Sequence, residues 1–233
     1  MTAIREYYQT LAAAYVRGKL ADAAVRAAHQ PLFAQPLEAL SAAELEQVIQ
    51  LGLDAGLRLH RFKRTMDLPR VRRVLGMLRG LQPTSLLDVG SGRGAFLWPL
   101  LEAFPVLPVT TVDLLDYRVA DMQAVHDGGV ALLSASRQDV TALTFADRSF
   151  DVVTMLEVLE HIPNTEQALA EVCRVAGRCV IFSMPSKADD NPEHIYLFTE
   201  QRLRELLAAQ GVRRVNISYV LNHMLVMATV GRS

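Results

Sequence analysis

The chain changes near residue 80 from a helical pattern to an alternation of strand and helix patterns, and this alternation constrains the fold most strongly. Short β-rich runs are mostly followed by amphipathic stretches of about ten residues. The runs are SLLDV, VTTVD, VALLSAS, FDVVTML, CVIFSMP, VRRVNISYV and MLVMATV. Strands separated by helices are joined by crossovers, which makes neighbouring strands parallel. We therefore expect an α/β fold with a seven-stranded, mostly parallel sheet.

The connection between the last two β-rich runs differs from the others. Only Leu221, Asn222 and His223 separate these runs. A parallel pair needs a long crossover, whereas so short a connection suits a hairpin. We therefore expect the last strand to be antiparallel.

Signals for helix starts divide the chain further. Ser41 with Glu44 forms a capping-box pair, and Asn164 with Gln167 resembles another one. Pro69 suits the first turn of a helix. A further helix is expected after Thr199. Helical patterns dominate before the alternation, so we expect residues 1–65 to form an N-terminal helical region and residues 66–233 to form the domain that holds the sheet.

Composition excludes several classes of protein. A net charge of −1 and 51% hydrophobic residues exclude a disordered chain and give no electrostatic reason to expect nucleic acid or a membrane surface as a partner. No apolar run approaches the length of a membrane span, and no secretory signal is recognised. Cys173 and Cys179 form neither a disulfide framework nor a zinc pattern, which is typical of the cytoplasm. We expect a globular, cytoplasmic protein, and the sequence does not indicate its oligomeric state.

A glycine-rich loop, from Asp88 to Gly94, follows the first β-rich run. Glycines let the chain turn sharply and let a ligand approach the backbone, and a helix N-terminus then offers N–H groups to an anion. The loop satisfies both the dinucleotide fingerprint and an acidic-x-Gly-x-Gly-x-Gly pattern. Asp113 ends the next β-rich run, where a carboxylate can accept hydrogen bonds from both ribose hydroxyls. An adenosine-type ligand therefore fits either pattern.

Several ordered motifs together resemble those of the class I S-adenosylmethionine-dependent methyltransferases. They are LLDVGSGRGAFL, VTTVDLLD, RQDVTALTFADRSFDVVTMLEVLEHIPN and PEHIYLFTEQRLRELL, within about residues 70–233. The resemblance implies a Rossmann-like fold and a methyltransferase that uses S-adenosyl-L-methionine and releases S-adenosyl-L-homocysteine. It also implies that residues 1–65 cap the substrate side.

The resemblance further implies roles for individual residues toward the cofactor. Asp88 would orient its methionine end, and Gly94 would open the following helix. Asp113 would hold the ribose, and Asp139 would accept a hydrogen bond from the adenine amino group. The expected cofactor-binding residues are Asp88, Gly90, Gly92, Gly94, Asp113, Leu114, Asp139, Val140 and Leu156.

Candidate catalytic residues lie in and after the EVLEHI segment. A sulfonium already carries its leaving group, so the protein mainly aligns the acceptor, and a hydroxyl acceptor also needs a proton acceptor. Glu157, His161 and His194 are the candidates for this work. We expect methylation of a small or medium acceptor, with oxygen as the preferred atom.

A metal site is an alternative for the same segment. If a helical turn begins at Glu157, then Glu160 and His161 share one face and could bind a divalent ion together with His194. Magnesium or manganese would suit such ligands. The pattern resembles one in metal-dependent small-RNA 2′-O-methyltransferases and in ubiquinone-pathway O-methyltransferases. Because EVLEHI is also frequent in relatives with no established metal role, we expect no metal requirement.

Two more alternatives stay open. The basic segment from Arg61 to Arg79 could dock an acidic substrate or RNA, but Phe62 alone supplies an aromatic ring there, so a solvated helix face is favoured. A regulatory protein could also keep the cofactor site without turnover. The sequence does not identify the acceptor, because substrate contacts come from variable loops.

Overall fold

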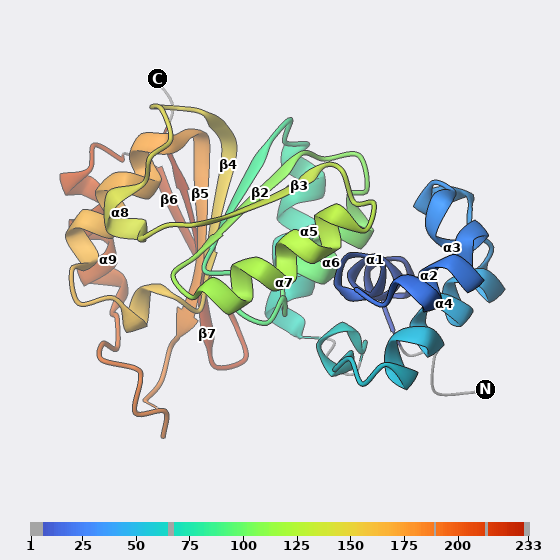
Figure 1. Cartoon of the computed structure of the whole chain (residues 1–233). Helices are drawn as coiled ribbons and strands as arrows, with labels where there is room; N and C mark the ends of the chain where they lie inside the picture. The colour runs from blue at the N-terminus through green and yellow to red at the C-terminus, as the bar shows by residue number, and fades with distance from the viewer. Residues whose placement is uncertain (1–6, 65–67, 189, 213, 231–233) are drawn as a thin grey trace.

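The computed structural model describes residues 7–64, 68–188, 190–212 and 214–230. Among these residues, seven strands form one sheet in the order β3-β2-β1-β4-β5-β7-β6, with helices on both faces (Figure 1). The strands are β1 (Leu86–Val89), β2 (Val109–Asp113), β3 (Leu133–Arg137), β4 (Phe150–Leu156), β5 (Ala176–Pro185), β6 (Arg214–Val220) and β7 (His223–Thr229). The expected mostly parallel sheet is confirmed.

The strands β1 to β5 run parallel, and β7 is antiparallel to both β5 and β6. The tight connection before His223 therefore forms a hairpin, as expected. Leu86 of β1 pairs with Val109 of β2 on one side and with Val152 of β4 on the other. The carboxyl ends of these strands consequently meet at one edge, where the order of strands reverses, and ligands of open α/β sheets bind at such a point.

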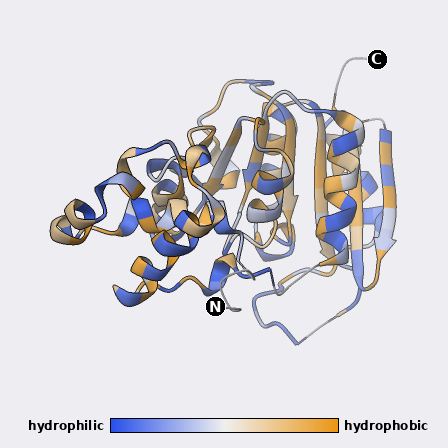
Figure 2. Cartoon of the chain, turned by 90° about the vertical axis from the view of Figure 1, so that its right-hand side faces the viewer, coloured by the Kyte–Doolittle hydropathy of each residue, from blue (hydrophilic) through white to orange (hydrophobic). Residues whose placement is uncertain are grey.

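Helices cover both faces of the sheet (Figure 1). One face carries α5 (Pro69–Leu81), α6 (Leu97–Ala103) and α7 (Asp116–Asp127), and the other carries α8 (Thr165–Val175) and α9 (Glu200–Ala209). The side chains of Asn164 and Thr199 accept hydrogen bonds from the first turns of α8 and α9, as expected. Figure 2 shows the strands as largely hydrophobic and the helices as striped, because only one side of each helix faces the core.

The N-terminal region is helical as expected. It contains α1 (Gln9–Lys19), α2 (Ala23–Ala28), α3 (Gln30–Ala34) and α4 (Ala42–Asp54). Ser41 and Glu44 form the reciprocal capping box before α4. No helix among the described residues is long and apolar enough to cross a membrane.

Small residues let α1 lie directly against α7. A Cβ at Gly18 would come within 2.0 Å of the carbonyl oxygen of Ala124, and one at Gly128 within 1.7 Å of that of Ala14. Any larger side chain would push the two helices apart. The N-terminal helices therefore share one hydrophobic core with the helices on this face of the sheet.

A buried polar group reinforces this contact. The Asp121 carboxylate of α7 accepts a hydrogen bond from the Tyr15 hydroxyl and is paired with Arg61 and Lys19. The predicted domain boundary between residues 65 and 66 lies outside the described residues. None of residues 7–64 lines the cavity described below. The role of this region as a cap stays a prediction.

The basic segment from Arg61 to Arg79 is partly neutralised within the chain. Besides the pair of Arg61 with Asp121, Arg64 is paired with Glu102, and Nε of Arg70 lies 3.5 Å from Oε1 of Glu157. These guanidinium groups therefore connect elements of the fold.

Candidate active site

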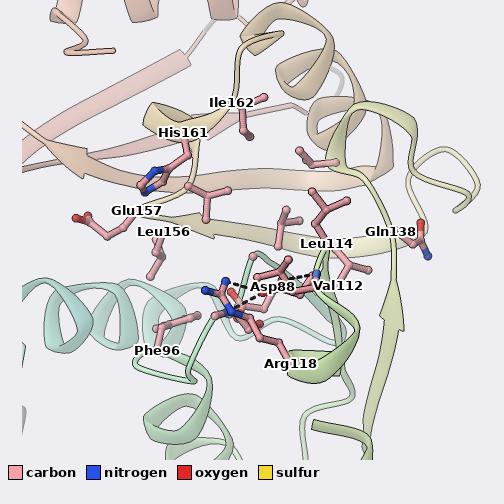
Figure 3. Close-up of a pocket in the computed structure, with 18 of the residues that line it drawn as sticks. Asp88, Phe96, Val112, Leu114, Arg118, Gln138, Leu156, Glu157, His161 and Ile162 are labelled. Atoms are coloured by element: carbon pink, nitrogen blue, oxygen red, sulfur yellow. Dashed lines mark hydrogen bonds and ion pairs between the residues drawn. The ribbon is translucent and has the colours of Figure 1, made fainter. Parts of the chain in front are cut away.

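A cavity of about 830 Å³ opens at the carboxyl ends of β1, β2 and β4 (Figure 3). Pockets that hold small ligands and cofactors usually measure about 300–1,000 Å³. The lining comes from the start of α5, the glycine loop, and the segments after β2, β3 and β4. Eight of the nine expected cofactor-binding residues are in the described lining, and Gly94 is not. The eight are Asp88, Gly90, Gly92, Asp113, Leu114, Asp139, Val140 and Leu156.

The glycine loop needs its glycines for different reasons. Gly90, Gly92 and Gly94 all have left-handed backbones, with φ of 70°, 58° and 82°. A Cβ at Gly90 would lie 2.6 Å from Val158, and one at Gly94 would lie 2.1 Å from Trp98. A Cβ at Gly92 would meet no atom closer than 3.8 Å, so this glycine leaves space at the cavity. Gly94 precedes α6 by three residues, and its carbonyl oxygen accepts a hydrogen bond from the N–H of Trp98.

Asp88 is a buried carboxyl group at the floor of the cavity. Burial raises its pKa to about 6. The hydroxyls of Ser91 and Thr154 donate hydrogen bonds to the carboxylate and lower the pKa, whereas the nearby charge of Asp113 raises it. Desolvation is the largest of these effects, and no cation of the described residues is among the causes.

Asp113 ends β2 and anchors the glycine loop. Its Oδ2 accepts a hydrogen bond from the N–H of Gly92, and its Oδ1 accepts one from the N–H of Leu115, both at 3.0 Å. Nη1 of Arg118 lies 3.5 Å from Oδ2. An ionised carboxylate has about four acceptor positions, so Asp113 keeps capacity for ribose hydroxyls.

Asp139 lies beside apolar walls after β3. Its Oδ1 accepts hydrogen bonds from the N–H and the hydroxyl of Thr141, and these bonds lower the pKa of Asp139. Leu114 and Val140 also line the cavity. A planar base between apolar side chains, with a carboxylate at its edge, fits this arrangement.

Glu157 occupies the other end of the cavity, directly after Leu156. Its φ is 56°, which is an unusual backbone for a residue with a side chain. Its Oε1 accepts a hydrogen bond of 2.6 Å from the Ser183 hydroxyl and lies 3.5 Å from Nε of Arg70, while its Oε2 lies 3.0 Å from Nδ1 of His223. Three segments that are distant in sequence thus hold this carboxylate.

The two candidate histidines lie next to each other, but only one lines the cavity. His161 lines it, and its Nδ1 donates to the carbonyl oxygen of Glu193 at 2.9 Å. The His194 ring lies 4.8 Å from the His161 ring and is not among the described lining residues. Nε2 of His194 is 4.0 Å from Oε1 of the fully buried Glu160.

The four residues of the metal alternative divide into two groups. Ligand atoms of Glu160, His161 and His194 lie within 4.8 Å of one another. The Glu157 carboxylate instead contacts Ser183 and His223. The expected turn after Glu157 does form, as a 3₁₀ segment from Leu159 to His161, but the left-handed backbone of Glu157 directs its side chain elsewhere.

Sequence reasoning missed four polar residues of this site. Arg70 was grouped with a basic helix face, and Arg118, Ser183 and His223 were assigned no role. A signal existed only for Arg70, because Pro69 marks the helix start that lies next to the cavity. Arg118 lies on α7, five residues after Asp113, whereas Ser183 and His223 reach the site through strand order.

Comparison with known proteins agrees with this geometry. Residues 87–181 match a family described as a methyltransferase domain. A crystal structure of an S-adenosylmethionine-dependent methyltransferase from Aquifex aeolicus superposes with a TM-score of 0.57 at 18% identity, covering 71% of this chain and 100% of that one. Residues 87–181 are therefore a methyltransferase domain by sequence, and the fold is that of S-adenosylmethionine-dependent methyltransferases.

Curated relatives of this methyltransferase domain act on different acceptors. The chain is 26% identical to the malonyl-[acyl-carrier protein] O-methyltransferase of Methylococcus capsulatus, over 59% of this chain and 55% of that protein. It is 36% identical to the ubiquinone biosynthesis O-methyltransferase of Idiomarina loihiensis, over 45% of this chain and 43% of that protein. The chain thus spans about half the length of these relatives in the matches.

Proposed function

We propose that this protein transfers a methyl group from S-adenosylmethionine to an oxygen atom of a small or medium acceptor. One observation carries the proposal: a single cavity joins the glycine loop, Asp113 and Asp139 at one end to Glu157 and His161 at the other. The first group suits the cofactor, and the second suits a hydroxyl or carboxyl acceptor. The names of the two relatives described above, which are O-methyltransferases, support oxygen as the accepting atom, although another matched relative is a C-methyltransferase.

The lining residues fit S-adenosylmethionine. Gly92 leaves open space where the methionine part would pass, Asp113 would bind the ribose, and Asp139 would bind the adenine amino group between Leu114 and Val140. Asp88 would face the methionine end. When bound, the cofactor supplies the methyl group and a thioether leaving group. The chain has to orient the acceptor and to remove its proton.

The acceptor-side roles follow from the positions of three side chains. Glu157 lines the cavity at the end of β4 and would accept the proton of the acceptor. His161 has its Nδ1 committed to the carbonyl of Glu193, so Nε2 would bind the acceptor oxygen. His194 packs against His161 and would act through it. This assignment needs no metal.

A metal-assisted reaction is the second candidate, favoured by the grouping of Glu160, His161 and His194. Its acceptors would be RNA or quinols. The first experiment is therefore an acceptor panel of phenols, quinols, carrier-bound carboxylic acids and RNA, with product detected by mass spectrometry, with and without chelator. Methylated oxygen in chelator supports the proposal. Binding of cofactor without any product indicates a regulatory protein.

A further inference from the structure

His223 approaches the acceptor end of the cavity from the last strand of the sheet. Because β7 is antiparallel to β5, its first residue pairs with Pro185 at the carboxyl end of β5. The N–H of Ser186 donates to the carbonyl oxygen of Asn222 at 2.8 Å, which fixes the hairpin turn there. His223 is thereby held next to Glu157, with Nδ1 3.0 Å from Oε2.

The two oxygens of Glu157 have different neighbours. Oε1 receives the Ser183 hydroxyl and lies near Arg70, whereas Oε2 lies 3.0 Å from Nδ1 of His223, a buried nitrogen that has no hydrogen-bond partner among the described residues. Glu157 lines the cavity and His223 does not. The His223 side chain is nevertheless 26% exposed. The Glu157 side chain is itself 21% exposed, and the His223 imidazole gives its carboxylate a route to solvent besides the cavity.

We infer that Glu157 and His223 form a relay that carries the acceptor's proton from the cavity to solvent. This inference rests on the proposed oxygen methylation. A hydroxyl acceptor must lose its proton when it is methylated, and the base that takes the proton must pass it on before the next turnover. Imidazole is the side chain best suited to pass protons at neutral pH.

The relay conserves atoms and charge. The acceptor O–H bond breaks and its proton goes to the Glu157 carboxylate, while the oxygen bonds to the methyl carbon as the carbon–sulfur bond breaks and its electron pair stays on sulfur. Nδ1 of His223 takes the proton from Glu157. Nε2 of His223 then releases its own proton to water, which leaves His223 neutral with a proton on Nδ1. Exchange of ring protons with water returns the starting tautomer, and both residues are then restored. Arg70 and Ser183 hold Oε1, so the transfer uses Oε2.

The test compares His223→Asn and His223→Ala with wild type on two phenol acceptors of similar size. One phenol is neutral at the assay pH, and the other is already ionised. Asn keeps a polar group near Nδ1 and can hold Glu157, but it cannot pass a proton. A His60→Ala variant, at an exposed position that is not among the described lining residues of the cavity, is the control.

General base catalysis contributes about 10²–10⁴-fold, and loss of the relay removes part of it because Glu157 stays in place, so kcat for the neutral phenol should fall about tenfold or more in both His223 variants. The KM, the binding of S-adenosylhomocysteine and kcat for the ionised phenol should change little, and imidazole should partly restore His223→Ala. Wild-type kcat in His223→Asn, or equal losses with both phenols, overturns the relay and leaves His223 as a positioning residue. Absence of product from wild type with every acceptor refutes the proposed function itself, and the relay with it.

Discussion

Asp88 gives the sharpest quantitative prediction, because its carboxyl group is fully buried and has no cationic partner among the described residues. Burial raises its pKa from 3.8 to about 6. A difference of about 2 pKa units corresponds to about 3 kcal/mol. A raised pKa means that the native state binds the proton more tightly than the unfolded state. The stabilisation is therefore complete below about pH 4 and is lost as the pH rises through about 6.

Replacing Asp88 by Asn removes this titration and keeps the shape of the side chain. The free energy of unfolding of wild type, measured relative to Asp88→Asn, should fall by about 3 kcal/mol between about pH 4 and pH 7 and stay level above that. Urea unfolding followed by circular dichroism at several pH values measures it, with the exposed Asp54→Asn as a control. A difference that does not vary with pH, or that grows with pH, would show that the hydroxyls of Ser91 and Thr154 outweigh desolvation.

Other predictions concern the cofactor and the histidines. Asp113→Ala should lower cofactor affinity at least about tenfold, because charge-assisted hydrogen bonds are worth about 1.5–3 kcal/mol each; unchanged affinity in calorimetry would contradict the ribose assignment. Gly92→Ala should weaken binding more than folding, since a left-handed alanine costs only about 1–2 kcal/mol while its Cβ enters the cofactor's space. Asp139→Ala should lose the preference for S-adenosylmethionine over its inosine analogue, and retained discrimination would make Asp139 only a turn residue. Chelators should leave turnover unchanged, and activity abolished by chelator and restored by magnesium or manganese would favour the metal-assisted reaction instead. His194→Ala should lower turnover more than cofactor affinity.

The sequence could point to most residues of the proposed cofactor end because their signals are local, and the structure places eight of the nine around one cavity. Glycines in a short loop, a carboxylate at the end of a β-rich run and polar caps before helices each depend on neighbours within a few residues. The same locality explains why helices after Ser41, Asn164 and Thr199 begin where the sequence predicts.

The acceptor end could not be predicted in the same way. The expected group of Glu157 with Glu160 and His161 assumed a regular helical turn after β4, whereas the left-handed backbone of Glu157 sends its side chain toward Ser183 instead. No periodicity or motif encodes that direction, because it depends on the backbone of a single residue.

The sequence by itself thus determined the succession of strands and helices along the chain, the antiparallel last strand and the glycine loop with its carboxylates. Each of these follows from hydrophobic period, turn length or steric freedom within a short segment. Only the tertiary structure decided that Arg70, Ser183 and His223 surround Glu157. These residues come from three separate segments, and the strand order brings them to one edge of the sheet. Such proximity depends on which strands the crossovers and the final hairpin place next to each other in the sheet, and no local sequence pattern specifies this.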